Sequence, residues 1–382
     1  MPLTASRSQA PCDTAHMASA NASAVISFAR GVPSPDLLPV ADIAAAAERA
    51  LEQDPAGALA YGDGAGYAPL RQWVATRYGD GDAGRVLCTN GSLQGLALLA
   101  ETLFAGSGGR AIVEAPTYDR AILILRRFGA TVESADLEAD GIDVDAIEAA
   151  CRAGRVPGLV YTIPNFQNPG GMTLSRAKRE RLVALAREHG FLVLEDDPYG
   201  ELRFEGEDEP RMFDLDEGAG HVIYSTSFTK TVAPGVRTGA MVLPPALHAK
   251  LRKLAIDTYI GPSMLSEATV AQYCAAGAFE PNVERMRRAL VERRDALVSA
   301  VDAHLGDRAR YVAPAGGYFL WLDLPGVDAD ALADAADAAG TPVVKGSTCF
   351  TDGRGRDALR LAYSACPARD MDEGIARLAA LL

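Results

Sequence analysis

Helical and strand-like patterns of hydrophobic residues alternate along the chain from about residue 42 to residue 304. Apolar side chains recur with helical spacing in segments 42–53, 92–104, 176–190 and 281–305. Between them lie short apolar runs of strand length, at 110–116, 130–137, 158–164, 191–197, 221–227 and 239–244. This alternation predicts an α/β fold, in which crossover units build a mostly parallel sheet with helices on both faces.

The pattern changes after residue 305. Segments 309–325 and 358–364 resemble strands of a smaller α+β unit, so we place a domain boundary near residue 281. At the other end, residues 1–24 are rich in Ala and Ser but contain Asp13, His16 and Asn21. They lack the basic start and apolar centre of a secretory signal, and we predict a disordered arm there.

Composition and charge narrow the class of protein. The chain of 382 residues carries 37 Lys and Arg against 50 Asp and Glu, a formal charge of −13. This balance argues against a nucleic-acid partner and an anionic membrane surface, since both are bound through clustered cations. No apolar run reaches the length needed to span a bilayer. The six cysteines form no CxxC pair, which is typical of reduced thiols in a cytosol.

Metal and nucleotide motifs are missing from the sequence. The five histidines show neither HxH nor HExxH spacing, so we expect no metal site of that kind. Two Gly-rich stretches, 61–71 and 106–110, lack the strand–loop–helix context of a dinucleotide or P-loop fingerprint. The chemistry must therefore be sought elsewhere.

Polar residues gather where the predicted strands end, which is where parallel α/β sheets bind ligands. The run 191–197 ends in Glu195, Asp196 and Asp197. These carboxylates could hold Mg²⁺ or cap the following turn, and capping is the simpler interpretation. The run 158–164 leads to Asn165 and Asn168.

Two further segments have the outline of an anion site. The run 221–227 ends in Ser227 and is followed by Lys230 and Arg237. Upstream, a strand-like run passes through Gly91 and Ser92 into the predicted helix 92–104. Backbone N–H groups at such a helix start suit a phosphate.

Taken in order along the chain, these strand ends resemble the fold-type-I pyridoxal-phosphate enzymes, specifically the class I/II aminotransferases of the 2-aminoadipate or regulator-associated group. The resemblance extends from segment 26–39 to segment 358–364. It implies a large domain at 46–281 with a mostly parallel central sheet, which binds the cofactor. A smaller α+β domain would comprise 282–382, joined by an N-terminal segment at 25–45.

The resemblance assigns roles around the cofactor ring. Lys230 would form the Schiff base with pyridoxal 5′-phosphate and move the substrate α-proton. Asp196, three residues before Tyr199, would keep the pyridine nitrogen protonated. Tyr199 and Asn168 would hydrogen-bond the phenolate oxygen, and Tyr118 would stack on the ring.

It also implies a phosphate site. The N–H groups of Ser92 and Leu93, after Gly91, would bind the phosphate together with the Ser227 hydroxyl and the Arg237 guanidinium. Relatives commonly carry Gln or an aromatic residue where this chain has Leu93. The backbone donor survives that change, whereas a side-chain contact is lost.

Substrate contacts and a second subunit follow from the same resemblance. Arg360 would clamp the substrate α-carboxylate, with Asn168 beside it and Gly31 in the segment that covers the substrate. Tyr61 would reach the phosphate of the other subunit's site, which requires a homodimer. Lys345 stands where relatives often have Pro, and is either a solvated charge, which we favour, or a contact for an acidic substrate group.

The resemblance implies a cytoplasmic, homodimeric aminotransferase that moves an amino group between an α-amino acid and a 2-oxo acid. One alternative keeps the cofactor but changes the reaction to elimination, replacement, cyclisation or carbon–carbon bond formation. A second alternative is a non-catalytic ligand-sensing domain. That reading requires a DNA-binding helix-turn-helix, for which the residues before Ile26 are too few.

Overall fold

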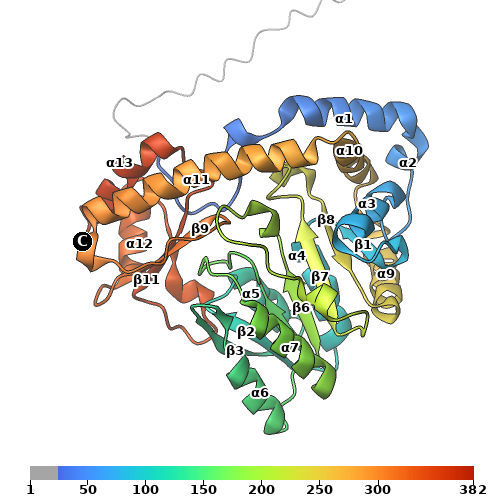
Figure 1. The fold of residues 1–382 in the computed structure, drawn as a ribbon, viewed down its shortest axis with the longest axis horizontal. Helices are drawn as coiled ribbons and strands as arrows, with labels where there is room; N and C mark the ends of the chain where they lie inside the picture. The colour runs from blue at the N-terminus through green and yellow to red at the C-terminus, as the bar shows by residue number, and fades with distance from the viewer. Residues whose placement is uncertain (1–24) are drawn as a thin grey trace, which may run out of the picture.

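The computed structural model describes residues 25–382, and the predicted arm at 1–24 lies outside the described residues. Two sheets organise the chain (Figure 1): one of eight strands in the order β1-β8-β7-β6-β5-β2-β3-β4, and one of three strands in the order β10-β11-β9. The strands of the large sheet are β1 (Val86–Thr89), β2 (Arg110–Ala115), β3 (Thr131–Glu138), β4 (Gly141–Ile142), β5 (Leu159–Thr162), β6 (Leu192–Asp196), β7 (Val222–Ser227) and β8 (Gly239–Val242).

The helices cover both faces of the large sheet. They are α1 (Val40–Gln53), α2 (Pro55–Leu59), α3 (Ala68–Tyr78), α4 (Ser92–Phe104), α5 (Asp119–Arg127), α6 (Val144–Arg152), α7 (Arg176–His189), α8 (Met212–Leu215), α9 (Pro245–Tyr259), α10 (Met264–Ala275), α11 (Phe279–His304), α12 (Ala329–Ala338) and α13 (Ala368–Ala379). The long helix α11 extends from α10 to the small sheet (Figure 1).

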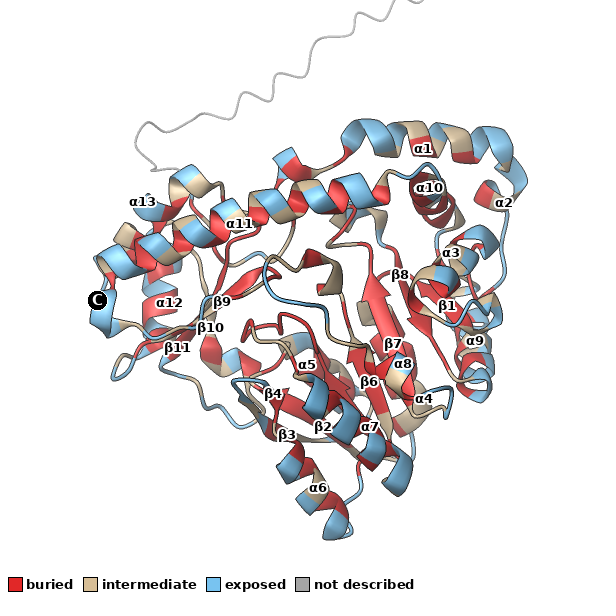
Figure 2. Ribbon diagram, viewed as in Figure 1, coloured by how far each residue is buried: buried red, intermediate tan, exposed pale blue. Residues whose placement is uncertain are grey.

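Alternating strand residues belong to two separate cores, as the pleat of a strand requires. In β2, Val113 belongs to the core that includes residues of α4, α5 and α9, whereas its neighbour Ile112 belongs to the core that includes residues of α6 and α7. The strands are therefore buried on both sides, as the red interior of Figure 2 shows. This explains the continuous apolar runs of the sequence and confirms the predicted α/β fold with a mostly parallel sheet.

Strand direction determines where the polar strand ends meet. Strands β7, β6, β5, β2 and β3 pair in parallel. Strand β8 is antiparallel to both β7 and β1, so β1 runs in the same direction as the parallel group. The carboxyl ends of β1, β2, β5, β6 and β7 consequently lie at one edge of the sheet.

The small sheet faces this edge and consists of β9 (Phe319–Asp323), β10 (Val344–Lys345) and β11 (Ala358–Ala362). Within 309–325 only Phe319–Asp323 forms a strand, because Pro314, Gly316 and Gly317 interrupt the pattern before it. The N-terminal segment joins this part: Phe28 N–H donates to Pro342 O, and Ala362 N–H donates to Phe28 O. The domain division itself stays a prediction.

A buried carboxyl on α10 gives the fold a pH-dependent stability. Glu267 is 1% exposed; one oxygen accepts from Tyr67 N–H at 2.7 Å and the other has no partner. Burial raises the pKa of Glu267 to about 8, against an ordinary value of 4.5. The folded state therefore holds a proton that the unfolded state loses, so stability declines as pH rises from about 4.5 to about 8, by at most about 1.4 kcal/mol per pH unit.

We expect Glu267→Gln to remove this contribution. Relative to wild type, the cofactor-free variant should gain in free energy of unfolding between pH 5 and pH 8, as measured by urea denaturation at several pH values. A constant difference between the two proteins across this range would contradict the assignment.

Candidate active site

A cavity of about 340 Å³ opens at the carboxyl edge of the large sheet, where the small sheet faces it. Every predicted site residue except Tyr61 lines this cavity: Gly31, Gly91, Ser92, Leu93, Tyr118, Asn168, Asp196, Tyr199, Ser227, Lys230, Arg237 and Arg360. They come from the ends of β1, β2, β5, β6 and β7, from β11 and from the N-terminal segment. The fold thus brings together residues that are up to 329 positions apart, from Gly31 to Arg360.

Lys230 lies in the turn that follows β7. Its Nζ donates to the Gly31 carbonyl at 2.6 Å, and its own carbonyl accepts from the Tyr318 hydroxyl at 2.8 Å. Burial lowers the pKa of Lys230 to about 8, and the positive charge of Arg360 contributes to the shift. A lysine in this state has a substantial neutral, nucleophilic fraction near neutral pH.

The three acidic residues at the end of β6 point in different directions. Glu195 accepts from Met212 N–H and Phe213 N–H at the start of α8, and Asp197 accepts from Gly200 N–H. Asp197 thus caps the following turn, as the sequence led us to expect, whereas Glu195 caps a helix that begins 17 residues further along the chain. Asp196 alone reaches the cavity.

Asp196 has one satisfied oxygen and one without a partner. The Tyr161 hydroxyl donates to Oδ2 at 2.8 Å, while Oδ1 is buried and unpaired. Burial raises the pKa of Asp196 to about 6, and the neighbouring Asp197 adds to the shift. A buried unpaired carboxylate oxygen is costly, so an acceptor is held here for a group that the protein does not itself supply.

The start of α4 forms a cationic cradle. Gly91 has φ 91°, and a Cβ there would meet Arg237 Nη2 at 2.6 Å. Arg237, with φ 46°, donates to Asn90 O at 3.0 Å. The first N–H groups of a helix have no partner within it, so those of Ser92 and Leu93 are available to an anion.

Arg360 occupies the opposite wall, on β11. Nη1 donates to Asn168 Oδ1 at 3.1 Å and Nη2 to Ala29 O at 2.8 Å, whereas Nε is buried without a partner. The guanidinium carbon lies 4.5 Å from the centre of the Phe319 ring, a cation–π contact that supports its plane. The cavity therefore has an acidic acceptor, an amine and two cationic anchors.

Comparison with known proteins identifies this arrangement. The family model for aminotransferase class I and II matches residues 23–378. The 2-aminoadipate transaminase of Thermus thermophilus is 36% identical over 357 residues, which cover 93% of this chain and 89% of the relative. The chain belongs to the class I and II aminotransferases. The predicted resemblance is confirmed.

Two further similarities agree with the assignment. Aromatic-amino-acid aminotransferase 1 of Thermococcus litoralis is 34% identical over 366 residues, which cover 93% of this chain and 87% of that protein. Among solved structures, the α-aminoadipate aminotransferase of Thermus thermophilus, complexed with N-(5′-phosphopyridoxyl)-L-leucine, superposes with a TM-score of 0.88 at 35% identity, covering 94% of this chain and 92% of that one.

Class I and II aminotransferases depend on pyridoxal phosphate, and this aminotransferase is such an enzyme. The residues present fit the cofactor. The unpaired Asp196 Oδ1 suits a protonated pyridine nitrogen, the Lys230 amine suits an aldehyde, and the cradle of Ser92 and Arg237 suits a phosphate.

Sequence reasoning missed several residues that shape the aminotransferase cavity. Phe319 and Val32 line it, and Tyr161 and Tyr318 hold Asp196 and Lys230 from behind. The alternation of side chains in a strand places Phe319 and Trp321 on the same face of β9, and this could be predicted from the sequence. The pairing of β9 with β11, which brings that face to Arg360, could not be predicted.

Three singled-out residues lie away from the cavity. Tyr61 is 87% exposed and lines a separate groove with segment 259–265. Lys345 pairs with Asp334 at 2.7 Å, which agrees with a surface charge rather than a substrate contact. The third, Asn165, is buried and does not line the cavity.

Metal-binding groups and membrane-spanning helices were sought in the described residues. Across residues 25–382 no group of three His, Cys, Asp or Glu side chains is arranged to hold a metal ion. No helix in that same range is long and apolar enough to cross a membrane.

Proposed function

We propose that this aminotransferase binds pyridoxal phosphate in the cavity at the carboxyl edge of the sheet and uses Lys230 to transfer the amino group. The observation that carries the proposal is the buried, unpaired Asp196 Oδ1, which lines the same cavity as the Lys230 amine. When bound, the cofactor accepts the amino group of one α-amino acid and later gives it to a 2-oxo acid.

The protein groups around the ring have separate tasks. Lys230 attaches the cofactor and carries the proton that leaves and rejoins the reacting carbons. Asp196 keeps the pyridine nitrogen protonated, and Tyr199 and Asn168 donate to the phenolate oxygen. Tyr118 packs on the ring face.

Two groups of residues anchor the cofactor phosphate and the substrate carboxylate. The N–H groups of Ser92 and Leu93, with Ser227 and Arg237, bind the phosphate. Arg360 then binds the substrate α-carboxylate through its fork, with Asn168 beside it and the Gly31 segment above. These contacts orient the substrate and exclude water from the reacting atoms.

The substrate side chain would meet a largely apolar surface. Val32 and Phe319 line the cavity near Arg360. Among the lining residues the cations are Lys230, Arg237 and Arg360, and each already has a task. We therefore expect aromatic or branched apolar amino acids to react faster than acidic ones, although the relatives' names include both kinds.

We also propose a cytoplasmic homodimer. Exposed apolar side chains line the groove that contains Tyr61, namely Leu59, Ile260 and Leu265. Such a patch favours coverage by a second copy, which would place Tyr61 at the partner's phosphate site. The five cysteines of residues 25–382 are all free, which supports a reducing compartment.

The experiment is a half-reaction. Purified protein, loaded with pyridoxal phosphate and shown by sedimentation to have twice the mass of one chain, is mixed with phenylalanine, leucine, 2-aminoadipate and aspartate in turn. We expect the visible cofactor band to disappear while one 2-oxo acid forms per site. Loss of a side-chain substituent or ring closure, without a 2-oxo acid, would instead favour the elimination or cyclisation alternative.

A further inference from the structure

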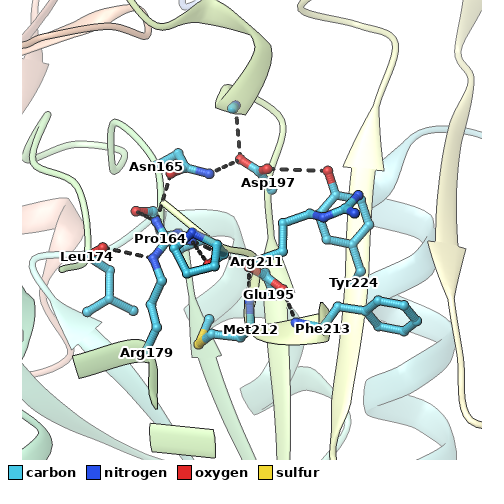
Figure 3. A network of polar contacts seen from close by, with 12 residues as sticks. Pro164, Asn165, Leu174, Arg179, Glu195, Asp197, Arg211, Met212, Phe213 and Tyr224 are labelled. Atoms are coloured by element: carbon cyan, nitrogen blue, oxygen red, sulfur yellow. Dashed lines mark hydrogen bonds and ion pairs between the residues drawn. The ribbon is translucent and has the colours of Figure 1, made fainter. Parts of the chain in front are cut away.

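Figure 3 shows a buried polar network whose central residues do not line the cavity. It links the loop after β5 to the end of β6. Its central members are Asn165, Arg179 and Asp197, whose exposed fractions are 6%, 0% and 6%. Nothing in the proposed chemistry uses these side chains, although burying them in such a place is costly.

Asn165 bridges the network with both ends of its amide. Nδ2 donates to Asp197 Oδ1 at 2.9 Å, and Oδ1 accepts from Arg179 Nη2 at 2.8 Å. A neutral amide can donate to a carboxylate through its NH₂ group and accept from a guanidinium through its oxygen at the same time.

Arg179 fixes the loop that carries Asn165. From helix α7 it donates to Leu174 O at 2.8 Å and to Pro164 O at 2.9 Å. These two carbonyls lie on either side of the loop 165–173, so one guanidinium holds both ends of it. Asn168 projects from the middle of this loop into the cavity.

Asp197 fixes the end of strand β6, on the other side of the network from the loop. Its N–H donates to Ser225 O on β7 at 2.7 Å, its Oδ1 also accepts from Gly200 N–H, and the Tyr224 hydroxyl donates to its Oδ2. Its backbone neighbour Asp196 turns the opposite way, into the cavity. The position of Asp197 therefore determines where Asp196 stands.

We propose that Asn165 is a positioning residue, whose hydrogen bond to Asp197 sets the spacing between Asn168 and Asp196 across the cofactor ring. The inference rests on the proposed function, in which Asn168 contacts the phenolate oxygen and Asp196 the pyridine nitrogen. Those two ring positions have a fixed separation, so the protein contacts are effective together only when the loop and the strand end are locked to each other.

Two substitutions test the bridge. Asn165→Ala removes both hydrogen bonds. Asn165→Asp keeps the shape and the acceptor for Arg179 but replaces the donor to Asp197 with a second carboxylate oxygen. The charged and titratable groups around this position are Arg179, Arg203, Glu195, Asp197, Glu201, Glu209 and Tyr224.

The matched control is Asp216→Asn, before β7 at the opposite edge of the sheet. Asp216 is 2% exposed and its Oδ2 accepts from three backbone N–H groups, of Gly220, His221 and Val222. It perturbs an equally buried polar cluster that is remote from the cavity, so it measures the general cost of such a change.

Cofactor binding to the apoprotein gives the first measurement. We expect Asn165→Ala to raise the dissociation constant for pyridoxal phosphate about tenfold or more. We also expect the pH midpoint of the visible band of lysine-bound cofactor to move by about 0.5 unit or more. Asn165→Asp should bind weakly at pH 8 and recover relative to wild type at pH 6, where a shared proton restores a donor. Asp216→Asn should lower the unfolding temperature without changing either cofactor property.

The outcomes separate the two levels of the proposal. If wild type binds no pyridoxal phosphate, the proposed function fails. If wild type binds it and the Asn165 variants differ from wild type only in unfolding temperature, as the control does, the positioning role is overturned. Should Asn165→Asp not fold, Asn165→Ala still decides between these results through its binding constant and its pH midpoint.

Discussion

Replacing Lys230 by alanine is expected to reduce the transamination rate by at least about 10⁴-fold, because one side chain supplies both the covalent attachment and the proton transfer. The visible band of lysine-bound cofactor should vanish as well. Lys230 is held by its hydrogen bond to the Gly31 carbonyl of the N-terminal segment, and among residues 25–382 no other lysine lines the cavity. The variant should still bind pyridoxal phosphate through the cradle of Ser92 and Arg237.

The pH dependence of cofactor attachment tests the same residue in wild type. Only the neutral amine attacks an aldehyde, and burial lowers the pKa of Lys230 to about 8 from an ordinary 10.5. The attachment rate should therefore rise with pH up to about 8 and then level off, as stopped-flow absorbance would show. A rate that keeps rising to pH 10 would place the titration on an unperturbed amine.

A surface lysine gives the control. Lys253 pairs with Asp257 one helical turn away on α9 and is far from the cavity in the fold. Lys253→Ala should retain the visible band and full activity. Substantial activity in Lys230→Ala, with this control unchanged, would contradict the role of Lys230.

Arg360→Ala is expected to lower kcat/KM for amino acids by about 10² to 10³-fold. The guanidinium fork is the substrate carboxylate anchor of the proposal, and loss of a charge-assisted hydrogen-bonded pair costs about 3 to 4 kcal/mol in a buried site. Arg360→Lys should recover little of this loss, because an ammonium cannot bind a carboxylate through two parallel bonds or stack on Phe319 in the same way.

Substrate analogues make this second prediction specific. A primary amine without a carboxylate, such as phenethylamine, should react slowly with wild type and no more slowly with Arg360→Ala. Arg356→Lys is the matched control, since Arg356 lies just before β11, is exposed and pairs with Asp328. If Arg360→Ala slows the amine as much as the amino acid, Arg360 supports the fold of the cavity rather than the carboxylate.

The residues at the strand ends were predictable because the carboxyl ends of parallel strands all lie at the same edge of the sheet. Once 191–197 and 221–227 are identified as parallel strands, Asp196 and Lys230 must approach each other. The capping of α8 by Glu195 could not be predicted in this way, because Met212 lies 17 residues further along the chain. The hydrophobic pattern was sufficient to place Asp196 and Lys230 at one edge of the sheet, whereas their roles at the cofactor came from the family resemblance.

Other residues depend on pairings that no local pattern encodes. Phe319 reaches Arg360 only because β9 pairs with β11, and Asn165 is significant only because Arg179, fourteen residues later, turns back to it. Only the strand Phe319–Asp323 formed within 309–325, since the backbone before it is broken by Pro and Gly. Long-range contacts of this kind are properties of the folded chain.

The joining of Phe28 to Pro342 and Ala362 has a consequence for the order of folding. Loop closure over more than 300 residues is entropically late, and a chain leaving the ribosome cannot complete it until β11 has been synthesised. The lysine and the phosphate cradle belong to the earlier part of the chain, whereas the roof of the cavity and the carboxylate fork arrive with its last strand. During synthesis, the ability to hold a cofactor would therefore precede the ability to select a substrate.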